Sequence, residues 1–252
     1  MVLDLRGKGA IVAGTRRLGG AVVRKLAAEG VRLAIVYRSS EAEANALARE
    51  VTPLVDRVCL LQADLTVEAE VGAIVEQARY ELGDLSFSVN LASDYPSVPL
   101  SRLDANDWEA GLAAAKATYL LAVHSARVIR RNASGRTRGQ LIFCGDWAAG
   151  ATPYRGHLPY LTGKAAIHFL TRVFARELAE DGILVNALAP GPTLRPSGLD
   201  ESAWRRILSS TPLGRSSSAE DMAEMVATLL KSETITGEVI RVDSGRHVAG
   251  FP

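Results

Sequence analysis

The chain has 252 residues, of which 48% are hydrophobic and 23% charged, a balance typical of a globular protein with a sizeable core. Its 29 Lys and Arg and 28 Asp and Glu leave a net charge of +1, which argues against a nucleic-acid-binding protein or one that binds an acidic membrane surface. The chain has only two cysteines, which argues against a disulfide framework, and four histidines without ligand spacing, which argues against a metal site. No apolar run approaches the roughly 18 residues that cross a bilayer. We therefore expect a cytoplasmic protein.

Short apolar segments alternate with helical patterns along the whole chain. In chain order, the pattern predicts strand 9–13, a helix ending at Glu29, strand 31–37, helix 41–51, strand 57–62, helix 67–82, strand 85–91, helix 106–131, strand 140–144, helix 157–179, strand 183–188 and strand 238–242. Strands this apolar, separated by helices, are typical of a parallel sheet that is covered on both faces. We therefore expect an α/β fold, a single doubly wound, Rossmann-like domain over residues 1–252 with about seven parallel strands and helices on both faces.

The segment 192–212 follows the sixth predicted strand and has the least regular pattern in the chain. Ligands bind beyond the carboxyl ends of the strands in sheets of this kind. We therefore expect residues 192–212 to form a lid on the substrate side.

A turn containing Gly14 and Gly19 joins the first strand to the first helix. Backbone N–H groups and the helix dipole at such a turn face a bound anion, and glycine allows the anion to approach closely. The position directly after a strand therefore predicts a dinucleotide pyrophosphate site, although a plain strand–helix turn is the alternative.

The second strand ends in Tyr37-Arg38-Ser39-Ser40, where an enzyme for a cofactor with a free ribose 2′-hydroxyl usually carries Asp or Glu. A guanidinium and two hydroxyls suit a 2′-phosphate, and Arg16 or Arg17 can add a second cation. We therefore expect NADPH/NADP as the cofactor rather than NAD(H). The alternative is that Arg38 is a solvated loop cation.

Tyr160 and Lys164 lie one helical turn apart on the same face of the predicted helix 157–179. A free tyrosine titrates at about 10, and a neighbouring ammonium group is expected to lower the pKa of the phenol. The spacing is weak evidence alone, but its place after the fifth strand of a nucleotide-binding fold indicates that Tyr160 is a general acid or base.

Several segments together resemble the short-chain dehydrogenase/reductase family over essentially the whole chain. They are the turn 14–19, the runs 63–66, 89–93, 185–187 and 190–192, the Tyr160/Lys164 pair and the closing run 236–245. The resemblance implies that Tyr160 donates a proton, that Lys164 orients the nicotinamide ribose and that Asp64 contacts adenine. It also implies a homo-oligomer, either a tetramer or a dimer.

The cofactor-binding residues that we expect from these motifs are Gly14, Arg16, Arg17, Leu18, Gly19, Tyr37, Arg38, Ser39, Ser40, Asp64, Leu65, Asn90, Ala92, Ser93, Tyr160, Lys164, Pro190 and Gly191.

Asp146 stands where the family normally has a Ser that binds the substrate carbonyl oxygen. An ionised carboxylate would repel the alkoxide formed from a ketone, but it can accept an N–H or share a proton with Tyr160. Tyr95 can stack on a flat ring, and the runs 17–19 and 37–47 are similar to those of pteridine reductases. This resemblance implies Asp146, Tyr160 and Lys164 as catalytic residues, and Ser93, Tyr95, Asp146 and Tyr160 as substrate-binding residues.

The sequence therefore favours an NADPH-dependent reductase that transfers hydride to a C=N bond of a pterin or folate-type heterocycle. One alternative is a short-chain ketone reductase for a 3-oxoacyl thioester or another carbonyl substrate, against which Asp146 argues. Another is a non-catalytic NADPH-binding sensor, because Ala114 replaces the Asn of the family's proton relay. The alternatives without a catalytic role are that Asp146 caps a turn and that Tyr95 is an ordinary aromatic residue of a loop.

Two further departures from the family pattern concern the cofactor side. The glycine turn is one residue shorter than usual, and Leu91 replaces the second Asn of the usual Asn-Asn-Ala run.

Overall fold

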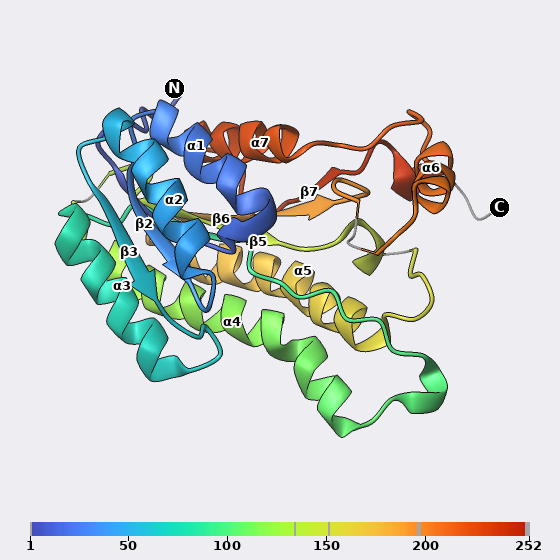
Figure 1. Cartoon of the computed structure of the whole chain (residues 1–252). Helices are drawn as coiled ribbons and strands as arrows, with labels where there is room; N and C mark the ends of the chain where they lie inside the picture. The colour runs from blue at the N-terminus through green and yellow to red at the C-terminus, as the bar shows by residue number, and fades with distance from the viewer. Residues whose placement is uncertain (1, 134, 151, 196–197, 250–252) are drawn as a thin grey trace.

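A parallel sheet between two layers of helices forms the body of the computed structural model, which describes residues 2–133, 135–150, 152–195 and 198–249 (Figure 1). The strands are β1 (Gly9–Ala13), β2 (Arg32–Tyr37), β3 (Val58–Gln62), β4 (Phe87–Asn90), β5 (Gly139–Cys144), β6 (Ile183–Pro190) and β7 (Val239–Val242). They lie in the order β3-β2-β1-β4-β5-β6-β7, and each neighbouring pair is parallel. The expected single-domain, doubly wound α/β fold is thereby confirmed.

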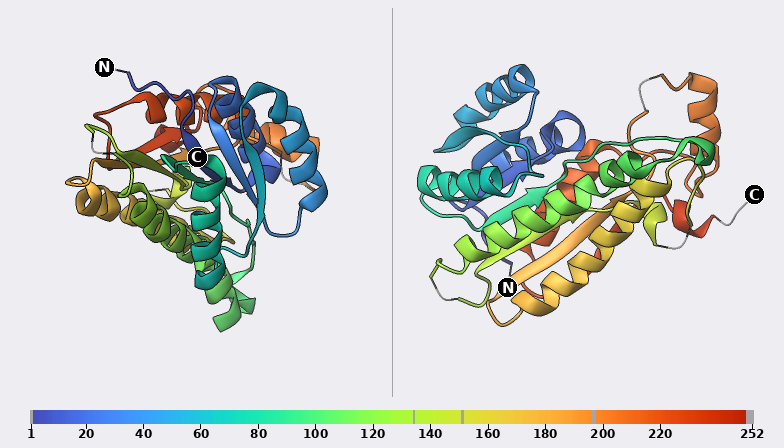
Figure 2. Two further views of the ribbon diagram at one scale, coloured as in Figure 1. Left: turned by 90° about the vertical axis from the view of Figure 1, so that its left-hand side faces the viewer. Right: turned by 90° about the horizontal axis from the view of Figure 1, so that it is seen from below.

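Within the described part of the chain, three helices cover each face of the sheet. The helices α1 (Gly20–Ala28), α2 (Glu41–Val51) and α7 (Ala219–Lys231) cover one face, and α3 (Glu68–Leu82), α4 (Ala105–Ile129) and α5 (Leu158–Leu178) cover the other. Seen from below, α3, α4 and α5 lie side by side across the sheet (Figure 2). Ile11 packs into the core under α3–α5, and Val12 packs into the core under α1, α2 and α7. Successive strand residues thus face two dry cores, which explains the unbroken apolar runs.

The helices begin and end close to the predicted positions. The helix α2 occupies the predicted range 41–51, and α3, α4 and α5 differ from prediction by one or two residues at their ends. The helix α4 begins with a capping box, because Asp104 accepts the Asp107 N–H while the Asp107 carboxylate accepts the Asp104 N–H.

The packing of α4 against α5 fixes the position of the second of these helices. A Cβ atom on Gly111 would collide with Pro159, and one on Gly163 would collide with the Gly111 carbonyl oxygen. The two helix backbones therefore touch at Gly163, which precedes Lys164 directly and follows Tyr160 by three residues on α5.

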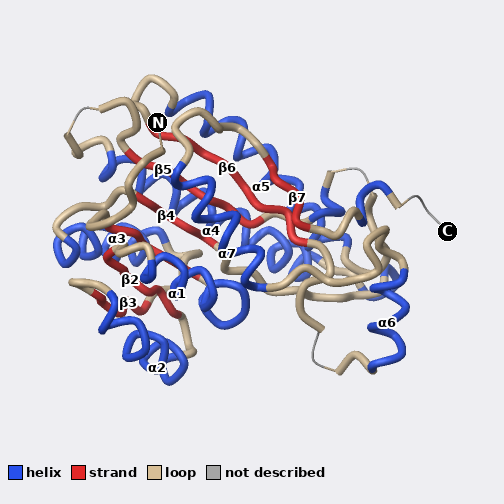
Figure 3. The backbone as a smooth tube through the Cα atoms, turned by 90° about the horizontal axis from the view of Figure 1, so that it is seen from above, coloured by secondary structure: helices blue, strands red, loops and turns tan. Residues whose placement is uncertain are grey.

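Among the described residues, the structure contains two helices, α6 (Glu201–Ser209) and α7, that the sequence pattern did not predict. The helix α7 has a capping box of Ser218 and Asp221, followed by buried Met222 and Val226, a signature that the sequence contains. The helix α6 buries no residue and lies away from the sheet (Figure 3). The segment 192–212, predicted to be the least regular, therefore contains a helix, while residues 196–197 within it lie outside the described residues.

Between the neighbours β1 and β4 the strand order reverses: the chain adds β2 and β3 on one side of β1, and β4 to β7 on the other. The chain leaves β1 for α1 on one face and leaves β4 for α4 on the other, and ligands of doubly wound folds bind at such a point, beyond the carboxyl ends of the two strands. Gly14 follows β1 with a φ of 84°, and a Cβ atom there would collide with the backbone of Leu91 and Ala92. The shortened glycine turn forms a single π-helical turn over Thr15–Gly19 and meets the end of β4.

None of the helices in the described ranges combines the length and the hydropathy that a bilayer crossing requires. Across residues 2–133, 135–150, 152–195 and 198–249, no three His, Cys, Asp or Glu side chains are grouped so that they could hold a metal ion.

The buried side chain of Phe87 tests the packing of the central strand β4. Phe87→Ala should lower the free energy of unfolding, measured by urea denaturation, by about 3–5 kcal/mol, because a large cavity replaces the ring. Tyr80→Ala is the matched control, since the Tyr80 side chain is 83% exposed, and it should change stability by less than about 0.5 kcal/mol. Equal losses in the two variants would contradict this account of the core.

Candidate active site

Asp146, Tyr160 and Lys164 come together beyond the carboxyl end of β5. The Tyr160 hydroxyl donates a hydrogen bond to Asp146 Oδ2 at 2.8 Å. Lys164 Nζ donates to the Cys144 carbonyl oxygen at 2.7 Å and lies 5.7 Å from the centroid of the Tyr160 ring. All three side chains are buried. The structure thus groups the three residues that the sequence predicts as catalytic.

The Asp146 carboxylate both caps a turn and contacts Tyr160. Its Oδ1 accepts the Ala148 N–H at 2.9 Å at the start of the 3₁₀ turn Trp147–Ala149, while the Tyr154 hydroxyl donates to Oδ2 at 3.3 Å. Burial raises the pKa of Asp146, and the bonds from Ala148, Tyr160 and Tyr154 oppose that rise only in part. Asp146 therefore caps the turn and contacts Tyr160 at the same time, so the two alternatives for this residue do not exclude each other.

The pKa of Tyr160 is raised, and the expectation that Lys164 lowers it is wrong. Burial is the largest cause, and the negative charge of Asp146 adds to it because both disfavour the phenolate. Lys164 directs its ammonium group to the Cys144 carbonyl instead of the phenol oxygen. Tyr160 is therefore held protonated at neutral pH, which is the state of a proton donor.

His168 is a buried site residue that the sequence reasoning missed. Its Nε2 atom accepts the backbone N–H of Asp146 at 3.3 Å, and a Cβ atom on Gly145 would collide with its ring. Burial first, then the charges of Arg241 and Lys164, lower the pKa of His168 to about 4, so the ring is neutral at neutral pH. The signal was present, because residues 160, 164 and 168 share one face of a helix.

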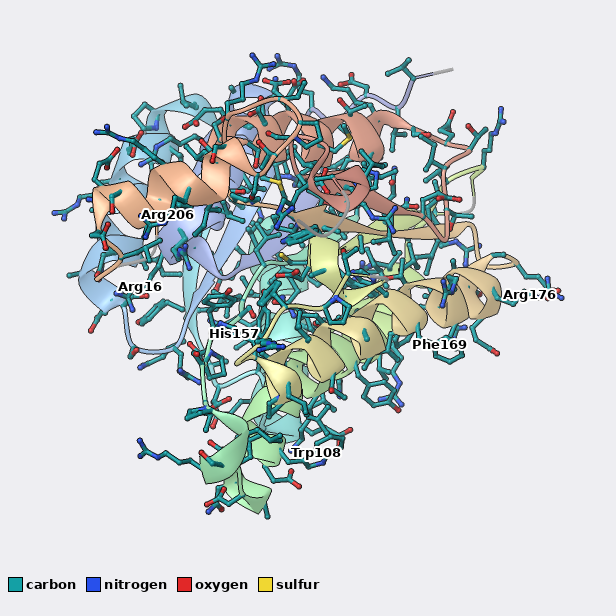
Figure 4. All side chains as sticks on the ribbon, turned by 90° about the vertical axis from the view of Figure 1, so that its right-hand side faces the viewer. Arg16, Trp108, His157, Phe169, Arg176 and Arg206 are labelled. Atoms are coloured by element: carbon teal, nitrogen blue, oxygen red, sulfur yellow. The ribbon has the colours of Figure 1, made fainter. Side chains whose placement is uncertain are left out.

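Aromatic rings surround the Asp146 carboxylate. Tyr95 stacks on His157 with ring centroids 4.3 Å apart and meets the Tyr160 ring edge-on at 4.9 Å. His157, at the start of α5 (Figure 4), is held by a contact of 2.8 Å between its Nδ1 and the Pro96 carbonyl oxygen. Trp147 and Tyr154 add a second pair with centroids 6.0 Å apart. The sequence reasoning missed Trp147, Tyr154 and His157 because the loop that carries them has no periodicity.

The predicted substrate residues differ in their surroundings. One face of the Tyr95 ring is covered by His157, yet 45% of the residue stays exposed. Ser93 is exposed, and its hydroxyl donates to the carbonyl oxygen of its neighbour Asp94 at 3.0 Å.

Three arginines lie at the carboxyl ends of β1 and β2. Arg38 follows β2, and its guanidinium is 60% exposed and 3.8 Å from the Asp94 carboxylate. Arg16 and Arg17 are exposed on the π-helical turn, where Figure 4 labels Arg16. Tyr37 packs against the core, while Ser39 is exposed and Ser40 precedes α2. This group has the charge that a phosphate requires.

The polar side chains at the ends of β3 and β4 are engaged within the protein. Asp64 Oδ1 accepts both the Thr66 hydroxyl at 2.7 Å and the Thr66 N–H at 2.8 Å, which lower the pKa of Asp64. Buried Asn90 donates to Thr118 on α4 and accepts the Ala92 N–H, each at 3.1 Å. At Ala114, the carbonyl oxygen accepts the Thr118 hydroxyl at 2.8 Å.

The other predicted cofactor residues follow the strands at the same edge of the sheet. They are Leu18 and Gly19 after β1, Leu65 after β3, Ala92 after β4, and Pro190 and Gly191 at the end of β6. Together with the close approach of Gly14 to Ala92, this edge fits a dinucleotide.

Comparisons with known proteins give consistent matches over nearly the whole chain. Residues 12–247 match the family described as Enoyl-(Acyl carrier protein) reductase. The chain is 30% identical over 246 residues to 3-oxoacyl-(acyl-carrier-protein) reductase FabG of Staphylococcus aureus, covering 96% of this chain and 98% of that protein.

Solved structures agree with these matches. A short-chain dehydrogenase/reductase from Serratia marcescens is 30% identical with a TM-score of 0.88, over 97% of this chain and 100% of that chain. A short chain dehydrogenase from Burkholderia cenocepacia, solved in complex with NADP, is 28% identical with a TM-score of 0.88, over 97% of this chain and 99% of that chain.

The lowered pKa of His168 predicts a pH-dependent stability. The unfolded chain binds more protons than the folded protein between about pH 4 and pH 6.5, so the free energy of unfolding rises with pH in that window. Lowering the pH from 7 to 5 should therefore cost about 1–2 kcal/mol through His168. Urea unfolding of His168→Gln at both pH values should show a smaller loss than the wild type, with His124→Gln on α4 as the matched control. The same loss in wild type and His168→Gln would show that His168 is not held neutral.

Proposed function

Because the chain belongs to the short-chain dehydrogenase/reductase family, we propose that it is an NADPH-dependent reductase. The backbone at Gly14 and the π-helical turn after it would hold the pyrophosphate, and Arg38 with Arg16 or Arg17 would hold the 2′-phosphate. When bound, NADPH supplies the hydride. The Burkholderia cenocepacia structure in complex with NADP supports the choice of cofactor.

Within this proposal, the chain's own residues move and position the proton. Tyr160 would donate its hydroxyl proton to the substrate; burial and Asp146 raise its pKa, so the phenol carries that proton before the transfer. Lys164, fixed by its bond to the Cys144 carbonyl, orients the nicotinamide ribose. The neutral His168 ring holds the backbone of Asp146 in place.

The substrate that the site favours is a C=N bond in a flat nitrogen heterocycle of the pterin or folate type. The observation that carries this proposal is the buried Asp146 carboxylate, which accepts the Tyr160 hydroxyl where a ketone reductase needs a donor. A carboxylate suits a substrate N–H beside the reacting bond. The exposed part of the Tyr95 ring gives the flat ring a stacking surface next to Tyr160, and Ser93 lies on the same loop.

The second candidate function is reduction of a ketone such as a 3-oxoacyl thioester. Two observations favour it: the Staphylococcus aureus relative is a 3-oxoacyl-(acyl-carrier-protein) reductase, and the pKa of Asp146 is raised. A protonated Asp146 would donate a hydrogen bond to a carbonyl oxygen, as the usual Ser does.

The same proposal extends to the lid and to self-association. Residues 192–212 would cover the substrate, since α6 lies beyond the carboxyl ends of the strands (Figure 1). Copies of the chain would associate as a tetramer or dimer through α4 and α5. Exposed Tyr119 on α4 and Phe169 and Val173 on α5 support this, and Figure 4 labels Phe169.

Arg38 tests the proposed choice of cofactor. Arg38→Asp should weaken NADPH binding by about 1.5–3 kcal/mol, because charge-assisted bonds to the 2′-phosphate are lost, and should not weaken NADH binding. Fluorescence titration measures both affinities. Arg49→Asp makes the same charge change on α2 and should leave both unchanged. If Arg38→Asp binds NADPH as tightly as the wild type, the 2′-phosphate lies elsewhere.

Asp146 separates the two candidate functions. Asp146→Ser restores a hydroxyl donor, so kcat/KM for a pterin should fall about 10–150-fold, the loss of one charge-assisted hydrogen bond, while ketone reduction stays unchanged or rises. Both substrates are assayed by NADPH absorbance at one pH. A parallel fall would make Asp146 a structural residue, and unaffected pterin reduction would remove the ground for the heterocycle proposal.

A further inference from the structure

Two phenol hydroxyls meet one carboxylate oxygen at the centre of the site. Asp146 Oδ2 accepts the Tyr160 hydroxyl at 2.8 Å and the Tyr154 hydroxyl at 3.3 Å. The catalytic set proposed above uses Tyr160 and leaves Tyr154 without a role.

The position of Tyr154 is set by aromatic packing. Its ring stacks on Trp147 with centroids 6.0 Å apart, meets His157 edge-on at 5.2 Å and lies 6.4 Å from Tyr95. A half-buried ring with neighbours on these sides loses little conformational freedom when its hydroxyl bonds to Asp146.

The donors on Asp146 show what Tyr154 contributes during the reaction. In the structure, Oδ1 accepts the Ala148 N–H, and Oδ2 accepts the two phenols. When Tyr160 gives its proton to a substrate, it stops donating to Oδ2. Among the described residues, Tyr154 is then the side chain that still donates a hydrogen bond to the buried carboxylate. Because Tyr154 donates to Oδ2, the second lone pair of Oδ1 remains available to accept a bond from the substrate.

We propose that Tyr154 is a positioning residue that keeps Asp146 a hydrogen-bond acceptor while Tyr160 donates to the substrate, so that the site selects substrates with an N–H next to the reacting bond. This inference rests on the proposed function for its substrate class, but the role of Tyr154 toward Asp146 follows from the contacts alone. Tyr154 touches no reacting atom and acts through the carboxylate.

Several other titratable groups face Asp146 from the surrounding elements, and the experiment has to separate them from Tyr154. They are Tyr160, Lys164 and His168 on α5, Cys144 on β5 and Tyr95 on the connection after β4. Replacing Tyr154 alone leaves all of them in place.

The experiment is a pH profile of kcat/KM for wild type, Tyr154→Phe and Asp146→Asn, with a pterin and with a simple ketone as substrates. The limb of the pH profile that disappears in Asp146→Asn reports the titration of Asp146. Tyr154→Phe removes a hydrogen bond to the charged carboxylate, so this limb should move up by about one pH unit. For the pterin, the rates of Tyr154→Phe and wild type should converge at high pH, where Asp146 is ionised in both. Tyr80→Phe removes an exposed phenol from α3 and should leave the profile unchanged.

A second comparison uses the double variant with Tyr154→Phe and Asp146→Asn. If Tyr154 acts through Asp146, its replacement should change kcat/KM less than twofold once the carboxylate is gone. Thermal unfolding without cofactor shows that each variant is folded.

The outcomes separate the two claims. An equal loss at all pH values, an unmoved limb, or the same effect of Tyr154→Phe with and without Asp146 would overturn the role of Tyr154. The substrate that the wild type reduces decides the proposed function independently, because the Asp146 limb moves to higher pH with either substrate if Tyr154 holds the carboxylate.

Discussion

The Asp146 side chain is buried, and the surrounding site compensates for the hydration that its carboxylate loses. An isolated carboxylate in a protein interior is unfavourable by several kcal/mol unless donors and an opposite charge replace the water. Here the donors come from the backbone of Ala148 and from two tyrosines, and the positive charge comes from Lys164. Because each partner must reach the same small volume, the positions of the loop after β5 and of the first two turns of α5 are linked.

That volume lies at the carboxyl edge of the sheet because every strand is parallel. A parallel sheet brings the ends of all its strands to one edge, so residues far apart in sequence become neighbours. Tyr95 follows β4, Asp146 follows β5 and Tyr160 lies in the first turn of α5, yet the Tyr160 side chain contacts both of the others. The glycine turn reaches the same edge between β1 and β4, where Gly14 packs on the backbone of Ala92.

Much of the fold could be predicted from the sequence because buried parallel strands need continuous apolar runs. The pattern identified all seven strands. It missed α7, although the capping residues Ser218 and Asp221 mark the start of that helix. It missed α6 because a helix that buries no residue gives no apolar face to find.

The site was predictable where chemistry depends on spacing along one helix and less so where it depends on a loop. Tyr160 and Lys164 are one turn apart, so their proximity follows from helix geometry. Tyr154 reaches Asp146 across an irregular segment, and the pKa of Tyr160 depends on burial that spacing does not reveal. The roles of these residues stay predictions until the variants are assayed.

The backbone contact of α4 with α5 through Gly111 and Gly163 has a consequence for how such a protein diversifies. The depth of the Tyr160 and Lys164 side chains is set by that contact, whose atoms belong to Gly111, Pro159 and Gly163 on α4 and α5. If residues 192–212 cover the substrate and Tyr160 donates the proton, as proposed above, changes in that segment can alter which molecules enter without displacing Tyr160 and Lys164. The substrate range could then change by mutation while the catalytic geometry is kept. Laboratory evolution of the substrate range could therefore randomise residues 198–212 alone.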